Sequence, residues 1–118
     1  MHALIIEDDG LIAMSIEEIL RDCGFTSFDF AASLDAAVAK ASTRCPALIT
    51  ADVELAPGSG IDAVQTICAK SRIPVVFITG RGDAARLRMP QHPVLNKPFC
   101  VSDVEAAVRQ VMQDQSSG

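Results

Sequence analysis

Aromatic residues are scarce in this sequence of 118 residues, which has no tryptophan, no tyrosine and only five phenylalanines. No apolar run approaches the length that a membrane span needs. The apolar first residues lack a basic leader and run into acids, so they do not resemble a secretion signal. We therefore expect a cytoplasmic protein that does not contact a membrane.

Basic residues are also few. The chain has 10 lysines and arginines against 15 acidic residues, and its net charge is −5. This balance argues against a nucleic-acid-binding surface. Hydrophobic residues make up 49% of the chain, enough for one domain with its own core. We expect that domain to cover residues 1–114, followed by a disordered tail at 115–118.

The four cysteines, Cys23, Cys45, Cys68 and Cys100, are far apart and form no CxxC pair. A zinc site needs clustered ligands, and a disulfide scaffold is typical of smaller, loop-rich secreted chains. We therefore expect free thiols that fill the core in a reducing cytosol.

Short apolar runs alternate with segments of helical periodicity along the whole chain. The runs predict strands at residues 3–6, 26–31, 47–51, 75–79 and 94–96. Apolar residues at helical spacing predict helices within 12–20, 34–41, 61–68, 83–88 and 101–112. Five strand–helix units in alternation indicate an α/β fold, a doubly wound parallel sheet with helices on both faces.

Polar side chains stand where the predicted strands end, and ligands of such sheets bind beyond these ends. Glu7 and Asp8 follow the first strand, Asp52 the third, Thr79 the fourth and Lys97 the fifth. Several carboxylates on one rim repel one another unless a cation lies among them, and hard oxygen ligands suit Mg²⁺. A hydroxyl and an ammonium on the same rim are suited to a bound phosphoryl group.

Five short motifs carry a resemblance to a known family: residues 4–9, residues 48–52, the turn from Pro57 to Gly60, Thr79 with Gly80, and residues 96–99. In this order and with these separations they resemble the receiver domain of bacterial response regulators, over essentially the whole chain. The resemblance implies a flavodoxin-like receiver fold with strand order 2-1-3-4-5.

The resemblance also implies a role for each acid. Asp52 is the phosphoacceptor and a metal ligand, Asp8 binds Mg²⁺ (or Mn²⁺) directly, and Glu7 binds it through water. Glu54 provides its backbone carbonyl as a further ligand. Asp9 beside them is better explained as a helix cap.

Two further residues would contact the phosphoryl group itself. The resemblance implies that Thr79 donates a hydrogen bond to it and that Lys97 pairs with it, across a cis Lys97–Pro98 bond. The donor is a phosphohistidine on a histidine kinase or a histidine phosphotransfer protein. The chain is then a signalling domain that acts by protein–protein contact, with no enzymatic activity beyond its own phosphorylation and dephosphorylation.

The sequence departs from the family pattern in two places. Many receivers have Tyr or Phe three positions before the lysine, where it moves inward with the threonine on phosphorylation, whereas this chain has Val94. The segment between Thr79 and Lys97 is also shorter by roughly one helical turn, so its helix must be short. We hypothesise that Val94 and the basic cluster in and around this segment (Arg81, Arg86 and Arg88) contribute to partner binding.

Other interpretations remain open at this point. The chain could be a receiver module of a longer hybrid histidine kinase or regulator. It could be a small aspartyl-phosphate phosphohydrolase, but these enzymes have a second acid two residues after the nucleophile, where Glu54 is only a longer substitute. A pseudo-receiver that takes no phosphate is disfavoured by the intact acids. The kinase, the pathway and any dimerisation are not readable from the sequence.

Two further features of the sequence have ordinary explanations. Residues 80–85 match the dinucleotide-binding pattern GxGxxA, but they follow the fourth strand, and no acid follows at the expected distance. We interpret the match as a tight turn. His2 and His92 are isolated in the sequence, so we expect them at the surface or in loops.

Overall fold

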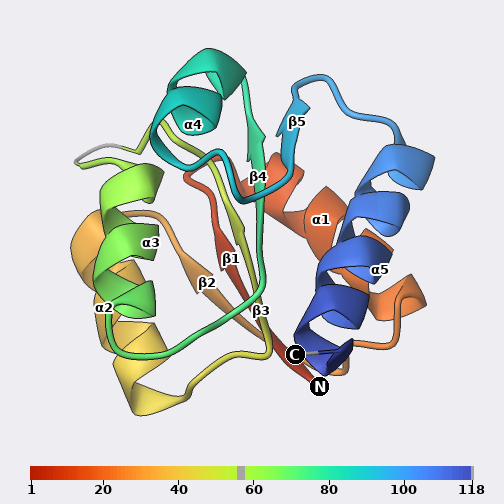
Figure 1. Ribbon diagram of the computed structural model, residues 1–118, viewed down its shortest axis with the longest axis horizontal. Coiled ribbons are helices and arrows are strands. Elements are labelled where there is room, and N and C mark those ends of the chain that lie inside the picture. Colours follow the sequence, from red (N-terminus) through yellow and green to blue (C-terminus); the bar gives the residue numbers. More distant parts are fainter. Residues whose placement is uncertain (56–57, 118) are drawn as a thin grey trace.

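The computed structural model describes residues 1–55 and 58–117, in which five strands alternate with five helices (Figure 1). The strands are β1 (His2–Ile6), β2 (Ser27–Ala31), β3 (Leu48–Ala51), β4 (Val75–Thr79) and β5 (Val94–Asn96). The helices are α1 (Gly10–Asp22), α2 (Leu34–Thr43), α3 (Gly60–Cys68), α4 (Gly82–Arg88) and α5 (Val101–Ser117). Each predicted strand and helix is present, with bounds that differ by a few residues.

All strand pairs are parallel, and the order in the sheet is β2-β1-β3-β4-β5. This confirms the predicted doubly wound α/β fold. Helices α2, α3 and α4 cover one face of the sheet, and α1 and α5 cover the other (Figure 1). Because both faces are covered, the central strands are buried throughout, which explains why they read as continuous apolar runs.

Polar caps fix where three helices begin. Asp9 Oδ1 accepts hydrogen bonds from the N–H groups of Leu11 and Ile12 at 3.0 and 3.2 Å, so the predicted cap is confirmed. Ser33 caps α2 and Ser59 caps α3 in the same way. After α1, Gly24 has φ +101°, a left-handed conformation that favours glycine. The Asp9 and Ser59 caps lie in the connections that follow β1 and β3.

The fourth helix is short, as its sequence predicts. It has seven residues, and the Arg81 side chain at its N-cap makes no capping hydrogen bond. Its own residues Gly82 and Ala85 are buried, and so is the Met89 side chain just beyond its last residue. The position of α4 therefore depends on contacts with its neighbours rather than on its own helical stability.

Two expectations about side chains are wrong. His2 lies in β1 and is buried, with Nδ1 2.8 Å from Ser27 Oγ and Nε2 3.0 Å from Asp29 Oδ2. Both nitrogens of the His2 ring thus have hydrogen-bond partners on the adjacent strand β2, although His2 is isolated in the sequence. Cys45 and Cys100 are exposed rather than core residues, although all four cysteines are free as predicted.

The predicted tail at 115–118 and the predicted turn from Pro57 to Gly60 each include a residue that the structure does not describe. The expected disordered tail at 115–118 overlaps the last turn of α5, which continues to Ser117, and residue 118 lies outside the described residues. Pro57 of the predicted turn also lies outside them. No helix in the described ranges is long and apolar enough to cross a membrane.

Candidate functional site

The carboxyl ends of the strands meet at one edge of the sheet, at the top of Figure 1. There the fold brings together the side chains of Glu7, Asp52 and Lys97, which are far apart in the sequence. Lys97 Nζ donates hydrogen bonds to Glu7 Oε1 and to Asp52 Oδ2, each at 2.7 Å. The lysine therefore bridges the acids that follow β1 and β3.

Three acids form a cluster that can hold a cation. Each of Glu7, Asp8 and Asp52 offers one carboxylate oxygen, and these oxygens lie within 4.8 Å of one another. Glu7 and Asp52 are buried, whereas Asp8 is exposed at the rim. A set of hard oxygen donors that is open to solvent on one side fits Mg²⁺, which keeps several waters when it binds to proteins.

Burial and hydrogen bonding have opposite effects on the pKa values of Glu7 and Lys97. Burial raises the pKa of the Glu7 carboxyl, and the hydrogen bond from Lys97 opposes this effect without cancelling it. Burial would lower the pKa of the Lys97 ammonium, but hydrogen bonds to Asp52 and Glu7 outweigh it, so the lysine pKa lies above its ordinary value. Lys97 is therefore held in its charged form, and the acids depend on its charge.

The backbone that follows β3 packs closely against Asp52, the candidate phosphoacceptor. The N–H of Glu54 donates to Asp52 Oδ1 at 3.2 Å, and the N–H of Gly60 donates to the carbonyl of Val53 at 2.9 Å. A Cβ at position 60 would lie 1.7 Å from the backbone oxygen of Asp52, so this position requires glycine. The role of the Glu54 carbonyl as a metal ligand stays a prediction.

Thr79 is fully buried at the end of β4. Its Oγ1 accepts hydrogen bonds from the backbone N–H groups of Val53 at 3.4 Å and Arg81 at 3.0 Å. A hydroxyl has two acceptor positions and one donor hydrogen. Both acceptor positions are thus used by the connections on either side of the site, and the hydrogen is left to donate. Sequence reasoning found Thr79 but not these two backbone partners.

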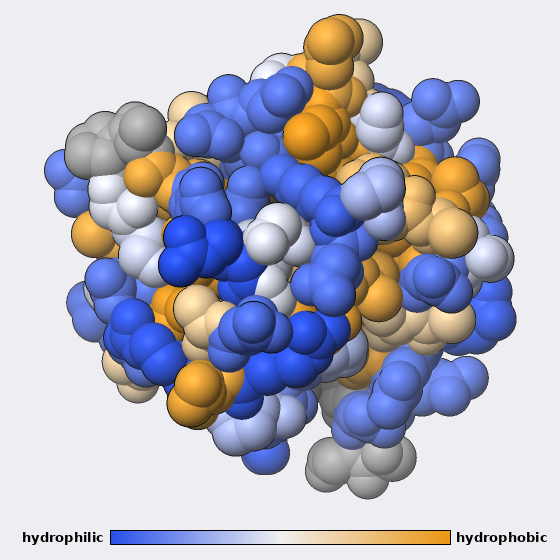
Figure 2. Space-filling model, turned by 90° about the horizontal axis from the view of Figure 1, so that it is seen from above, coloured by the Kyte–Doolittle hydropathy of each residue, from blue (hydrophilic) through white to orange (hydrophobic). Residues whose placement is uncertain are grey.

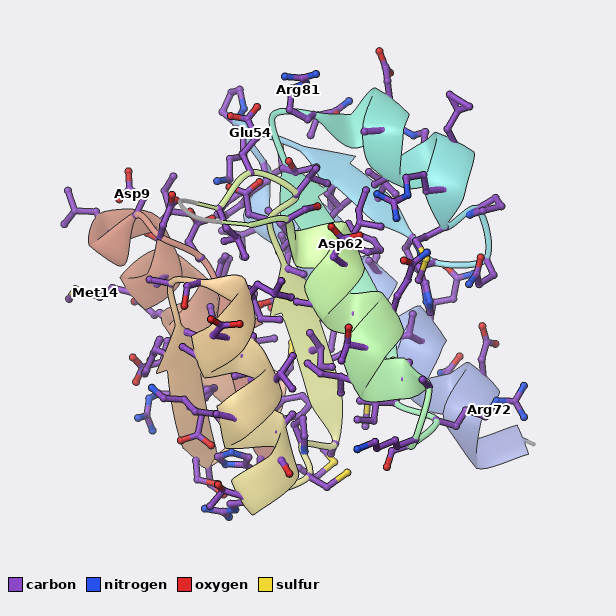
Figure 3. The ribbon with its side chains drawn as sticks, turned by 90° about the vertical axis from the view of Figure 1, so that its left-hand side faces the viewer. Asp9, Met14, Glu54, Asp62, Arg72 and Arg81 are labelled. Carbon is purple, nitrogen blue, oxygen red and sulfur yellow. The ribbon has the colours of Figure 1, made fainter. Side chains whose placement is uncertain are left out.

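The arginines of the basic cluster are exposed, but each has an intramolecular partner. Arg81 Nη1 lies 3.5 Å from Glu54 Oε1, and Figure 3 shows both side chains at the same end of the molecule. Arg86 lies 3.9 Å from Asp83 and also donates to the carbonyl of Val94 at 3.4 Å. Arg81 and Arg86 therefore each lie near a surface acid.

Arg88 contacts a neighbouring helix. Its Nη2 donates to Asp62 Oδ1 at 3.0 Å and to Gln65 Oε1 at 3.1 Å, both on α3. Asp62 is labelled in Figure 3 near the start of α3. Val94 is partly buried and packs against the core that α2, α3 and α4 share with the sheet. Val94 thus contributes a small apolar side chain beside this core.

Sequence reasoning missed an apolar area beside the acids. Leu11 and Met14 on α1 are 78% and 64% exposed, and Phe30 on β2 is 38% exposed. Met14 and Phe30 line an open hollow of about 480 Å³ together with Glu7 and Asp8. Figure 2 views the molecule from this end, where orange apolar side chains gather beside blue polar ones. The sequence does contain a signal for this area: Leu11 and Met14 are apolar but lie outside the helical spacing of the buried residues of α1.

Comparisons with known proteins agree with this geometry. Residues 3–109 match the family model of the response regulator receiver domain. The phyllosphere-induced regulator PhyR of Methylorubrum extorquens is 36% identical over 97% of this chain and 44% of its own length. The receiver domain of PhyR from Erythrobacter litoralis, solved by NMR, has a TM-score of 0.82 and 36% identity, with 95% of this chain and 89% of that chain covered.

A crystal structure of the anti-anti-sigma factor PhyR from Bartonella quintana has a TM-score of 0.82 and 36% identity, covering 98% of this chain and 49% of that chain. The chain thus spans about half the length of the full-length relatives it matches. The family match, the sheet order and the acidic cluster at the strand ends lead to one conclusion. This chain belongs to the response regulator receiver domain family.

Proposed function

We propose that this receiver domain accepts a phosphoryl group on Asp52 and passes the signal on by protein–protein contact. The observation that carries the proposal is the bridge from Lys97 to Asp52 and Glu7, with all three side chains at the carboxyl edge of the sheet. An ammonium 2.7 Å from a carboxylate can pair with the oxygens of a phosphoryl group that forms on it. The phosphodonor is a histidine kinase or a histidine phosphotransfer protein.

The transfer exchanges one bond to phosphorus for another. The bond between phosphorus and the donor imidazole nitrogen breaks as a bond to a carboxylate oxygen of Asp52 forms, and the imidazole takes up a proton from solvent. Lys97 then pairs with the phosphoryl oxygens, and the Thr79 hydroxyl donates to one of them. Hydrolysis of the aspartyl phosphate by water later ends the signal.

The acidic cluster would hold a divalent cation, Mg²⁺ or Mn²⁺, during this transfer. Asp8 and Asp52 would bind it directly, Glu7 through water, and Glu54 through its backbone carbonyl. The proximity of the carboxylate oxygens supports this assignment, because three neighbouring acids favour binding of a cation. When bound, the cation supplies positive charge that stabilises the phosphoryl oxygens.

The surface around α4 and β5 is proposed to contact the downstream partner, through Val94 and the side chains of Arg81, Arg86 and Arg88. One matched relative is an anti-anti-sigma factor, so an anti-sigma factor is one class of partner to screen. Alanine replacements at the three arginines should weaken binding of the kinase or of the downstream partner. If both affinities stayed unchanged, this part of the proposal would be dropped.

Transfer from a phosphorylated histidine phosphotransfer protein tests the proposed reaction. Radiolabelled phosphate should move to this chain when Mg²⁺ is present and stay on the donor when EDTA removes the metal. The product should be cleaved by hydroxylamine, as an acyl phosphate is, whereas phosphoserine is not. Transfer that is independent of metal, or a product resistant to hydroxylamine, would contradict the proposal.

A further inference from the structure

Arg88 joins the C-terminal end of α4 to α3. Arg88 Nη2 lies 3.0 Å from Asp62 and 3.1 Å from Gln65, two residues of the same helix. Gln65 in turn lies 3.7 Å from the sulfur of Met89, whose side chain is buried. A seven-residue helix without a side-chain cap has little stability of its own. The position of α4 therefore depends on contacts such as these.

The N-terminal end of α4 leads directly to the proposed phosphorylation site. The N–H of Arg81, one residue before α4, donates to Thr79 Oγ1 at 3.0 Å. The other donor to this oxygen, the N–H of Val53, belongs to the residue that follows Asp52. The two donors orient the hydroxyl between the two connections and leave its hydrogen for a phosphoryl oxygen. A shift of α4 would withdraw the Arg81 N–H and release the hydroxyl.

Both ends of α4 are thus tied to the segment that begins at Asp52. Arg81 pairs with Glu54, two residues after the phosphoacceptor, and Arg88 pairs with Asp62 on α3. Position 94 holds valine, so no aromatic ring at this position contributes to orienting Thr79. The N–H of Arg81 beside α4 and the N–H of Val53 are the two donors to its hydroxyl oxygen.

We propose that Arg88 is a positioning residue for the phosphoryl group, which holds α4 against α3 and thereby keeps the Thr79 hydroxyl ready to donate. This inference rests on the proposed function, because it assigns the source of order for one of that site's phosphoryl contacts. Arg88 does not touch the phosphoryl group and acts only through Thr79.

Beryllofluoride with Mg²⁺ is the probe, because it occupies an aspartate as a phosphoryl group does without being hydrolysed. Its affinity is measured by fluorine NMR titration of the full chain. Arg88→Ala and Asp62→Asn should each weaken binding about two- to fivefold, the range expected for losing one exposed ion pair. Asp35→Asn is the matched control, because Asp35 is also an acid in the first turn of a helix, on α2. It should bind as the wild type does.

Two combined variants separate positioning from a general loss of structure. Arg88→Ala added to Thr79→Ala should cause no further loss, because the residue through which it acts is already gone. Exchange of the charges, Asp62→Arg with Arg88→Asp, should restore part of the affinity. Wild-type affinity in Arg88→Ala, or an undiminished effect in the Thr79→Ala background, would overturn the positioning role alone. A wild type that does not bind beryllofluoride would overturn the proposed function as well.

Discussion

Lys97 Nζ lies 2.7 Å from Asp52 Oδ2, and this contact joins the end of β5 to the end of β3. The side chain of Asp52 is 8% exposed and that of Lys97 is 20% exposed, so the pair is largely shielded from water. Removing one member of a buried pair leaves an uncompensated charge, and Glu7 shares the same ammonium. Ion pairs thus hold the side chains of Glu7, Asp52 and Lys97 together.

Replacement of Lys97 should destabilise the protein, and Mg²⁺ should reverse part of this loss of stability. Lys97→Met leaves the Glu7 and Asp52 carboxylates without their cation, and we expect the free energy of unfolding to fall by about 3 kcal/mol. Saturating Mg²⁺ should recover part of this loss, because it would neutralise the same carboxylates. Urea unfolding with and without Mg²⁺ measures both, with the exposed Lys70→Met as control. Equal stability of Lys97→Met and wild type would contradict the bridge.

A buried hydroxyl in β3 offers a stability test away from the charges. Thr50 is 1% exposed, and its Oγ1 has no hydrogen-bond partner among the described residues. Thr50→Val should raise the free energy of unfolding by about 1 kcal/mol, since it removes an unsatisfied polar atom at nearly constant volume. Thr79→Val is the matched contrast and should lower it by about 1–3 kcal/mol, because two N–H groups lose their acceptor. Denaturant unfolding that gave the same sign for both would refute this distinction.

The turn after Asp52 has no room for a side chain at position 60. In Gly60→Ala the new Cβ would meet the Asp52 backbone, and we expect a loss of about 3 kcal/mol in stability together with impaired phosphorylation. Gly10→Ala is the control, because a Cβ at that position has no atom within 4 Å. Thermal unfolding and phosphoryl uptake are measured on both variants. A Gly60→Ala variant as stable as Gly10→Ala would show that the turn is looser than described.

We expect His92, between α4 and β5, to make stability sensitive to acid. Burial lowers the pKa of its imidazole below the ordinary value of 6.5, and its ring lies 6.0 Å from that of Phe77 in an edge-on contact. The folded state therefore favours neutral His92, and this contribution is present above pH 6.5 and is lost as the pH falls through the folded-state pKa.

Unfolding of wild type and His92→Gln at neutral and mildly acidic pH measures the effect. The wild type should lose more stability than the variant over this interval, because only the wild type has the His92 imidazole to protonate. The carboxylates are the same in both proteins and contribute equally. If the two curves ran parallel, His92 would have no part in the acid sensitivity.

The fold and most of the site follow from short sequence patterns. Buried parallel strands produce apolar runs, and the polar residues at their ends, such as Asp52 and Lys97, meet because the strands share one direction. The strand order came from the resemblance to receivers rather than from periodicity. Short-range signals also sufficed for Asp9, whose capping bonds reach only two and three residues along the chain.

Contacts between distant segments could not be read in this way. Arg88 and Asp62 are 26 positions apart and meet only because α4 lies beside α3. His2 seemed isolated because its partners, Ser27 and Asp29, lie on the neighbouring strand. In both cases the partner is fixed by the register or packing of two elements, which local periodicity does not determine.

Intact mass after incubation with Mg²⁺ and a small phosphodonor, such as acetyl phosphate, tests the central claim most directly. The wild type should gain the mass of one phosphoryl group, and Asp52→Asn, which keeps the size of the side chain, should gain none. A wild type without added phosphate, or an Asp52→Asn variant that takes it up equally, would contradict the assignment of Asp52 as the phosphoacceptor.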